Sequence, residues 1–193
     1  GTFPEPFIEN GTPTETRIRR LGVFVQDQVK FTEALSVRAG LRRDRVRNTT
    51  VADATRKDQA TSINVGVVYQ VRPGLAPYAS YSESFTPVAG TDAAGVAFRP
   101  ERGEQVEVGL KWEPAGLPVQ ASAAVYTLKE KNRLANDPDN VDGSIQLGKA
   151  TIKGVEAEAK AELGAWSLLG SYTYTRARAN TASFGGGLDS DQQ

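Results

Sequence analysis

The sequence lacks the two side chains that most often carry acid–base and nucleophilic chemistry, histidine and cysteine. The 193 residues include no histidine and no cysteine, so they lack the usual general base, the commonest metal ligand and thiol nucleophiles. The serines beside Glu83 in the segment SYSESF have no histidine or nearby lysine to activate them. We therefore predict that the chain carries no catalytic residues and is not an enzyme.

The acidic segment DPDNVDG at residues 137–143 could suggest a calcium site, because hard cations bind clustered carboxylates. The twelve-residue calcium loop would need a bidentate glutamate where Gly148 stands. Pro138 and Asn140 are instead typical of a turn. We predict no metal site here, and no cofactor bound directly by the protein's side chains.

Charge and hydropathy narrow the class of partner. Lys plus Arg equals Asp plus Glu at 23 each, so the chain lacks the excess of positive charge that nucleic-acid binding requires, and we expect no nucleic-acid partner. It also contains no run of about 20 apolar residues that could form a membrane-spanning helix. A β-barrel remains the one structure by which the chain could cross a bilayer.

The segment GVEAEAKAEL at residues 154–163 carries charge at every second position, with small apolar residues between. This is the period of a strand and not of a helix. The same alternation recurs along the chain and predicts an all-β, antiparallel up-and-down meander of about eight strands. The predicted strands lie near residues 17–31, 35–48, 60–71, 75–85, 104–113, 118–132, 150–162 and 166–178.

The connections between these strands alternate in length. Short ones follow the first, third, fifth and seventh strands, whereas long polar ones follow the second, fourth and sixth, at residues 48–59, 86–103 and 133–149. A meander with tight turns on one rim and long loops on the other is the layout of an outer-membrane barrel.

The two faces of each strand have different predicted surroundings. We expect the small apolar face to meet lipid and the charged face to line a wet or protein-filled lumen. Trp112 and Trp166 fall beside short connections on the apolar face, where an aromatic girdle would lie. The predicted lumen-facing polar residues are Arg20, Gln26, Arg38, Arg42, Glu107, Lys111, Glu156, Glu158 and Lys160.

Several segments, taken together and in order, resemble the barrel of TonB-dependent siderophore receptors, in particular the ferrichrome-receptor-like branch. The resemblance covers about residues 17 to 178. The segments are GVFVQDQVKF (22–31), YASYSESFTP (78–87), FRPERGEQVEVGLKWEP (98–114), AAVYTLKEKNRL with DPDN (123–134 and 137–140), KGVEAEAKAEL (153–163) and SYTYTRAR (171–178).

This resemblance implies a transmembrane β-barrel of about 22 strands in the outer membrane of a Gram-negative bacterium, with a plug domain inside it. It further implies uptake of a ferric siderophore as the transported ligand, on energy delivered by the TonB complex through the plug. Residues 1–193 would then form one partial barrel domain without the plug. The implied partners are the siderophore, outer-membrane lipid, the plug and the missing barrel strands.

Ligand contacts in such a receptor should come from the long loops, where aromatic and cationic groups could hold an anionic or aromatic iron chelate. The candidates are Phe85, Phe98, Arg99 and Arg102, in or beside the longest loop.

Three alternatives remain open at this point. The chain could be a soluble or secreted β-sheet adhesion or binding module. It could also be a small outer-membrane barrel whose eight strands close on themselves, with charged residues paired in a narrow interior. An outer-membrane enzyme would need catalytic residues in strands outside this chain.

Overall fold

A computed structural model describes residues 17–49, 55–92, 95–137 and 140–180. No helix long and apolar enough to cross a membrane occurs among these residues. The regular elements of the described part are the strands β1 (Arg17–Lys30), β2 (Leu35–Thr49), β3 (Thr55–Tyr69), β4 (Leu75–Thr86), β5 (Glu101–Trp112), β6 (Val119–Asp137), β7 (Asn140–Leu163) and β8 (Trp166–Asn180).

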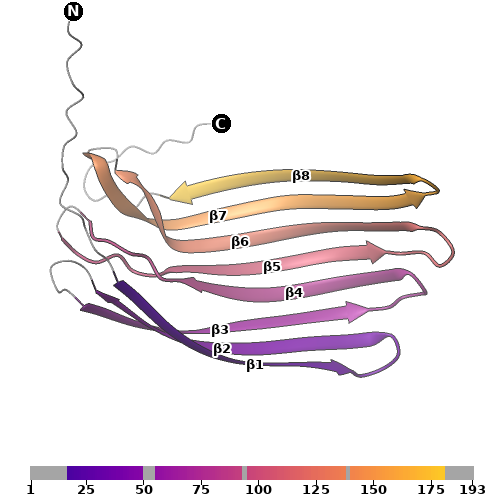
Figure 1. Ribbon diagram of the computed structural model, residues 1–193, viewed down its shortest axis with the longest axis horizontal. Helices are drawn as coiled ribbons and strands as arrows, with labels where there is room; N and C mark the ends of the chain where they lie inside the picture. The colour runs from indigo at the N-terminus through magenta and orange to yellow at the C-terminus, as the bar shows by residue number, and fades with distance from the viewer. Residues whose placement is uncertain (1–16, 50–54, 93–94, 138–139, 181–193) are drawn as a thin grey trace, which may run out of the picture.

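The strands form one antiparallel sheet in which each strand pairs with the next in the chain, in the order β1 to β8. Figure 1 shows this sheet as a single layer, with the tight turns at one end of the strands and the start of β1 and the end of β8 at the other. The prediction of an all-β meander of about eight strands is confirmed. β1 does not pair with β8 in the described sheet, so the alternative of a self-closed eight-stranded barrel was wrong.

The short connections are built around residues that can turn the chain sharply. They comprise residues 31–34, 70–74, 113–118 and 164–165, which link β1 to β2, β3 to β4, β5 to β6 and β7 to β8. Gly74, Gly116 and Gly164 have φ values of 79°, 81° and 63°, in the left-handed region that glycine adopts without the clash of a side chain. All four connections lie at the turn end of the sheet (Figure 1).

At the opposite end, the strands run further than the alternation predicts. β3 begins at Thr55 and β7 at Asn140, so most of the polar stretches expected as loops at 48–59 and 133–149 are paired strand. Alternation is a signal only where the two faces of a strand meet different surroundings. Sequence that is polar on both faces carries no such signal, and the predicted starts of β3 and β7 therefore lie too late in the chain.

Register assigns each residue to one of two faces, because residues directly opposite each other across a pair of strands point to the same side. One face collects Gln26, Gly40 and Asn64, and also Ser80 and Glu107 further along the sheet. We call this side the polar face. The other side is the apolar face.

The apolar face carries a band of exposed apolar side chains at the turn end of the sheet, interrupted on β1 by Asp27, and we call it the apolar band. On β8 the band covers residues 166–174, which at about 3.3 Å per residue and a tilt of about 45° would rise roughly 21 Å. Beyond the band, the next positions of this face turn charged on most strands. They include Arg19, Arg43, Glu83, Glu104, Lys153 and Arg176.

Two tyrosines lie over glycines of the neighbouring strand on the polar face. A side chain added at Gly109 would come within 2.5 Å of the ring of Tyr78, and one added at Gly154 would come equally close to the ring of Tyr126. Each glycine therefore leaves the space that an aromatic ring fills, which fastens β4 to β5 and β6 to β7 beyond their backbone hydrogen bonds.

The weakest joint of the sheet lies between β3 and β4. These strands pair only from Asn64 opposite Ser82 to Val68 opposite Tyr78, whereas every other neighbouring pair stays in register over most of its length. Past Asn64 and Ser82, away from the turns, the two strands are no longer paired. We call this gap the seam.

Candidate functional site

The nine polar residues predicted to face a lumen all lie on the polar face. On β1 and β2 the register aligns Gln26 with Gly40 and Arg42 with Phe24. On β5 to β7, Lys111 stands opposite Ser122, which in turn stands opposite Glu158. The set shares one side of the sheet: Arg20, Gln26, Arg38, Arg42, Glu107, Lys111, Glu156, Glu158 and Lys160.

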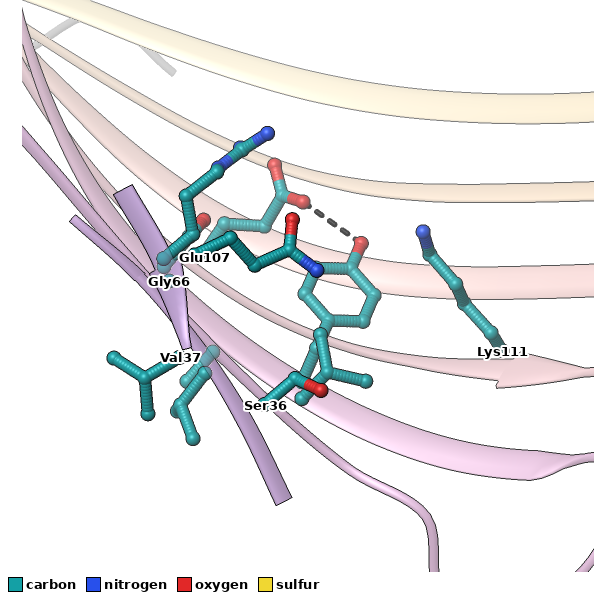
Figure 2. Close-up of a pocket in the computed structure, with 12 residues that line it drawn as sticks. Ser36, Val37, Gly66, Glu107 and Lys111 are labelled. Carbon is teal, nitrogen blue, oxygen red and sulfur yellow. Dashed lines mark hydrogen bonds between the residues drawn. The ribbon is translucent and has the colours of Figure 1, made fainter. Parts of the chain in front are cut away.

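A recess of about 330 Å³ opens over β1 to β5 near the turn end, and Figure 2 shows its lining. The Tyr78 hydroxyl donates to Glu107 Oε1 at 2.7 Å, and Gln105 Nε2 donates to Glu107 Oε2 at 3.0 Å. Lys111 Nζ lies 5.4 Å from the centre of the Tyr78 ring. Arg38 and Lys111 make no ion pair with the described residues, so the recess suits an occupant with a negative group.

Further from the turns, Asp44 lies between two arginines. Arg42 donates to both carboxylate oxygens, Nε to Oδ2 at 2.8 Å and Nη2 to Oδ1 at 2.9 Å, and Arg20 Nε donates to Oδ1 at 2.9 Å. The Asp44 side chain is 1% exposed, and its two partners are 38% and 40% exposed. Gly22 makes this arrangement possible, because a side chain there would meet Arg42 and Asp44.

Asp44 stands beyond the apolar band, and its ionisation follows from its neighbours. The hydrogen bond from Arg20, followed by the one from Arg42, lowers the pKa of Asp44 from 3.8 to about 2. The carboxylate therefore stays ionised at any physiological pH and keeps both guanidinium groups in place.

Phe85 fills the seam between β3 and β4. Its side chain is 6% exposed and forms a buried cluster with Val46 and Ala60, which lie on the polar face. Arg20 and Arg102 each place their guanidinium carbon 5.9 Å from the centre of its ring. Since register assigns these two arginines to opposite faces, the ring stands within the wall itself.

Other side chains bridge the seam where the backbone ladder is missing. Glu83 Oε2 accepts a hydrogen bond from the Ile63 amide at 3.1 Å, and Arg102 Nη2 donates to the Gln59 carbonyl at 3.5 Å. The Arg102 side chain therefore already has partners within the sheet, on its apolar face. The carboxylate of Glu83 bonds to backbone and to the Tyr81 hydroxyl, an arrangement that serves structure.

The connection from β4 to β5 folds back against β2 and β3. Asn48 Nδ2 donates to the Val88 carbonyl at 3.0 Å, and Arg56 Nη1 donates to the Ala97 carbonyl at 3.3 Å. Phe98 is 7% exposed and packs on Gly90, whose carbonyl accepts from the Phe98 amide at 3.2 Å. Two of the four ligand candidates, Phe85 and Phe98, are therefore buried, and Arg99 remains exposed.

The structure adds residues that sequence reasoning did not single out, among them Asp44, Asn48, Asn132 and Gln146. Asn132 has a φ of 60°, an uncommon value for a residue other than glycine. Asn48 is 3% exposed, and its Oδ1 atom has no hydrogen-bond partner among the described atoms. No spacing pattern marks these residues: Asn48, Asn132 and Gln146 bond to backbone groups distant in sequence, and Asp44 bonds to two arginine side chains, one of them on another strand.

The acidic segment at 137–143 falls partly outside the described residues, since residues 138–139 are not described. Within the described part of the chain, no group of three or more acidic side chains is arranged to hold a metal ion.

Comparison with known proteins decides the family. The family model described as the β-barrel of TonB-dependent receptor-like proteins matches residues 1–192. The chain belongs to this family. As a TonB-dependent receptor barrel, it is a protein of the outer membrane of Gram-negative bacteria, and the expected resemblance is confirmed.

Two curated relatives of this barrel are receptors for iron chelates by name. The ferrichrome outer membrane transporter/phage receptor of Escherichia coli is 39% identical over 168 residues, which cover 84% of this chain and 22% of the relative. The ferrioxamine B receptor of Salmonella typhimurium is 35% identical over 173 residues, 86% of this chain and 24% of the relative. The chain thus spans about a quarter of the length of these relatives.

A solved structure shows the same wall. The ferripyoverdine receptor of Pseudomonas aeruginosa, bound to ferripyoverdine, matches with a TM-score of 0.74 and 26% identity over 86% of this chain and 24% of that one. These relatives are named as receptors and transporters, not as enzymes.

Proposed function

We propose that this chain is a section of barrel wall in a receptor that takes up a ferric siderophore through the outer membrane. The observation that carries the proposal is the division of the sheet into an apolar band and a polar face, in a chain related to ferrichrome and ferrioxamine receptors. The apolar band would meet lipid, and the polar face would line the lumen. A soluble adhesion module would not expose so large an apolar surface to water.

The transported ligand is the ferric siderophore itself, with no cofactor resident in the wall. Uptake would proceed by binding and gated passage, without a bond being made or broken. The remaining partners would be a plug domain within the lumen, the barrel strands that pair with the open edges of β1 and β8, and the TonB complex that acts through the plug.

The polar face suggests how the wall contributes. Arg38 and Lys111 beside the recess of Figure 2 would receive negative groups of the plug, and the outer cluster of Arg20, Arg42 and Asp44 would hold the wall rigid near the ligand. Among the ligand candidates, Arg99 has an exposed side chain that no described group engages, so we retain it as the contact residue. Phe85, Phe98 and Arg102 would support the site by packing.

The test is uptake of iron by the full-length receptor. Iron-starved cells that lack their own siderophore receptors should accumulate labelled iron from ferric ferrichrome or ferric ferrioxamine B when they express it, and should stop when TonB is deleted. Binding of neither chelate by the purified full-length protein, and no accumulation with any ferric siderophore supplied, would reject the proposed function.

A further inference from the structure

Residues 97–100 connect two distant parts of the sheet at the end opposite the turns. On one side, the Ala97 carbonyl accepts from Arg56 of β3. Two residues later, the backbone of Arg99 is hydrogen-bonded to Gln146 of β7. The segment therefore touches strands that stand four places apart in the sheet, and Figure 1 shows the chain passing across this end between β4 and β5.

Gln146 grips Arg99 at two points. Its Oε1 accepts from the Arg99 amide at 2.8 Å, and its Nε2 donates to the Arg99 carbonyl at 2.6 Å. A side-chain amide reproduces in this way both hydrogen bonds that a neighbouring strand would offer. Nε2 also donates to the Asn132 carbonyl at 2.9 Å, so both amide hydrogens are used and the side chain is fixed to β6.

Neighbouring contacts keep the segment from sliding. Asn132 Nδ2 donates to the Pro100 carbonyl at 3.0 Å, and the Leu134 amide donates to Glu101 Oε1 at 3.0 Å. The left-handed φ of Asn132 accompanies one missing rung, since the β6 to β7 pairing passes from Lys131 to Arg133 without a change of register. Phe98, the residue before Arg99, is itself held in place by its buried ring.

Arg99 combines a fixed backbone with an exposed cation. Its amide and carbonyl are both held, yet its guanidinium is exposed and makes no hydrogen bond or ion pair with the described residues. A charged group whose backbone is ordered before binding loses less conformational freedom when a ligand arrives. Structural arginines elsewhere in the wall, such as Arg20 and Arg42, are instead already paired.

We propose that Gln146 is a positioning residue for ligand capture: it holds Arg99 so that the guanidinium can engage the negatively charged oxygens of a ferric chelate. This inference rests on the proposed function. It deepens it by naming one contact residue, the residue that orients it, and the chemistry recognised, which is an oxygen-rich iron complex.

The experiment is a double-mutant cycle in the full-length receptor, with ferric ferrichrome and ferric ferrioxamine B as probes. We expect Arg99→Ala and Gln146→Ala each to weaken binding of the recognised chelate about tenfold. In the Arg99→Ala background, Gln146→Ala should have little further effect, because both changes remove the same contact. Gln146→Glu should behave like Gln146→Ala, since a carboxylate cannot donate to the two carbonyl groups.

The control is Gln120→Ala, which removes a comparable side-chain hydrogen bond, Nε2 to Glu113 Oε1 at 3.0 Å, at the turn end of the sheet. It should leave binding unchanged. Unchanged affinity of the Gln146→Ala receptor, or losses that multiply in the double mutant, would overturn the inference. Both results differ from failure of the proposed function, in which the unaltered receptor binds neither chelate and cells accumulate iron from no ferric siderophore supplied.

Discussion

Asp44 gives up nearly all contact with water and gains two arginine partners in exchange. A buried carboxylate in this position stabilises the wall only while both guanidinium groups remain within hydrogen-bonding distance. Arg20 also lies against Phe85, and its Nη2 donates weakly to the Phe85 carbonyl at 3.5 Å. The ionisation of one side chain is thereby linked to the seam between β3 and β4.

The pH dependence of this cluster follows from the lowered pKa of Asp44. Because the pKa is about 2 in the folded protein and 3.8 is its ordinary value, the contribution to stability is complete above about pH 3.8 and is lost as the pH falls toward 2. We expect the urea midpoint of the full-length receptor in detergent to fall across this window. The difference in urea midpoint between the unaltered receptor and the Asp44→Asn variant should shrink over the same pH range.

At neutral pH, Asp44→Asn should lower the free energy of unfolding by about 2 kcal/mol, the range of a lost hydrogen bond to a charged group. A difference between the two proteins that stays constant from pH 6 to pH 2 would contradict this account of the cluster.

Phe85 gives a second prediction at this scale. Truncation to alanine should cost about 3 kcal/mol, since the ring is buried and the seam has no backbone ladder to close over the space. Phe85→Leu should recover part of the loss. The measurement is hydrogen exchange of the amides in β3 and β4 in the full-length receptor, and equal protection in all three proteins would show that the ring does not close the seam.

At the scale of strands, the pairing of glycine with tyrosine fixes neighbours side by side. Tyr78 lies over Gly109 and Tyr126 lies over Gly154, and the Tyr126 hydroxyl also reaches Thr175 of β8 at 3.1 Å. The missing side chain of each glycine is therefore part of the packing. A larger residue there would have to displace a ring that is fastened at its far end.

We expect Gly154→Val to destabilise the full-length receptor by about 2 kcal/mol, within the range for overpacking a close contact. Gly170→Val is the matched control, because a side chain at Gly170 would meet nothing within 4 Å. The measurement is the urea concentration at the midpoint of unfolding for each of the two variants. A loss at Gly170 as large as that at Gly154 would mean that the tyrosine contact is not the cause.

Strand segments whose residues alternate between two different surroundings could be predicted from the sequence. Segments that are polar on both faces could not be predicted in this way. Val155 to Leu163 is small and apolar on one side and charged on the other, so its strand was placed correctly. Residues 140–149 belong to the same strand but carry no comparable contrast. Gln146 could not be predicted as a site residue, because its partner Arg99 is 47 positions away in the chain.

At the scale of the whole molecule, the two faces of the sheet are suited to different surroundings, one to lipid and the other to water. The apolar side exposes Val108 at 52%, Val125 at 54% and Leu168 at 52%, a surface suited to acyl chains. The polar side bears the charged residues of β7 and the recess near the turns. This division is what ties the isolated section to a bilayer.

Val108→Arg should therefore destabilise the receptor by about 2 to 4 kcal/mol in lipid vesicles, the cost of a cation on the lipid face. Ser122→Arg is the matched control, on the adjacent strand and on the polar face, and should cost less than about 1 kcal/mol. Folding free energies in phospholipid vesicles measure both. Equal costs would place the two positions in the same surroundings and reject the assignment of the faces.

The seam also has a mechanical consequence. Five rungs join β3 to β4, and the next shortest joint, β5 to β6, has eleven. Under a pulling force applied at the two free edges, the section should tear first along this line, into a leaf of three strands and a leaf of five. There, the Phe85 ring and a few side-chain hydrogen bonds replace the backbone hydrogen bonds that join the other strands.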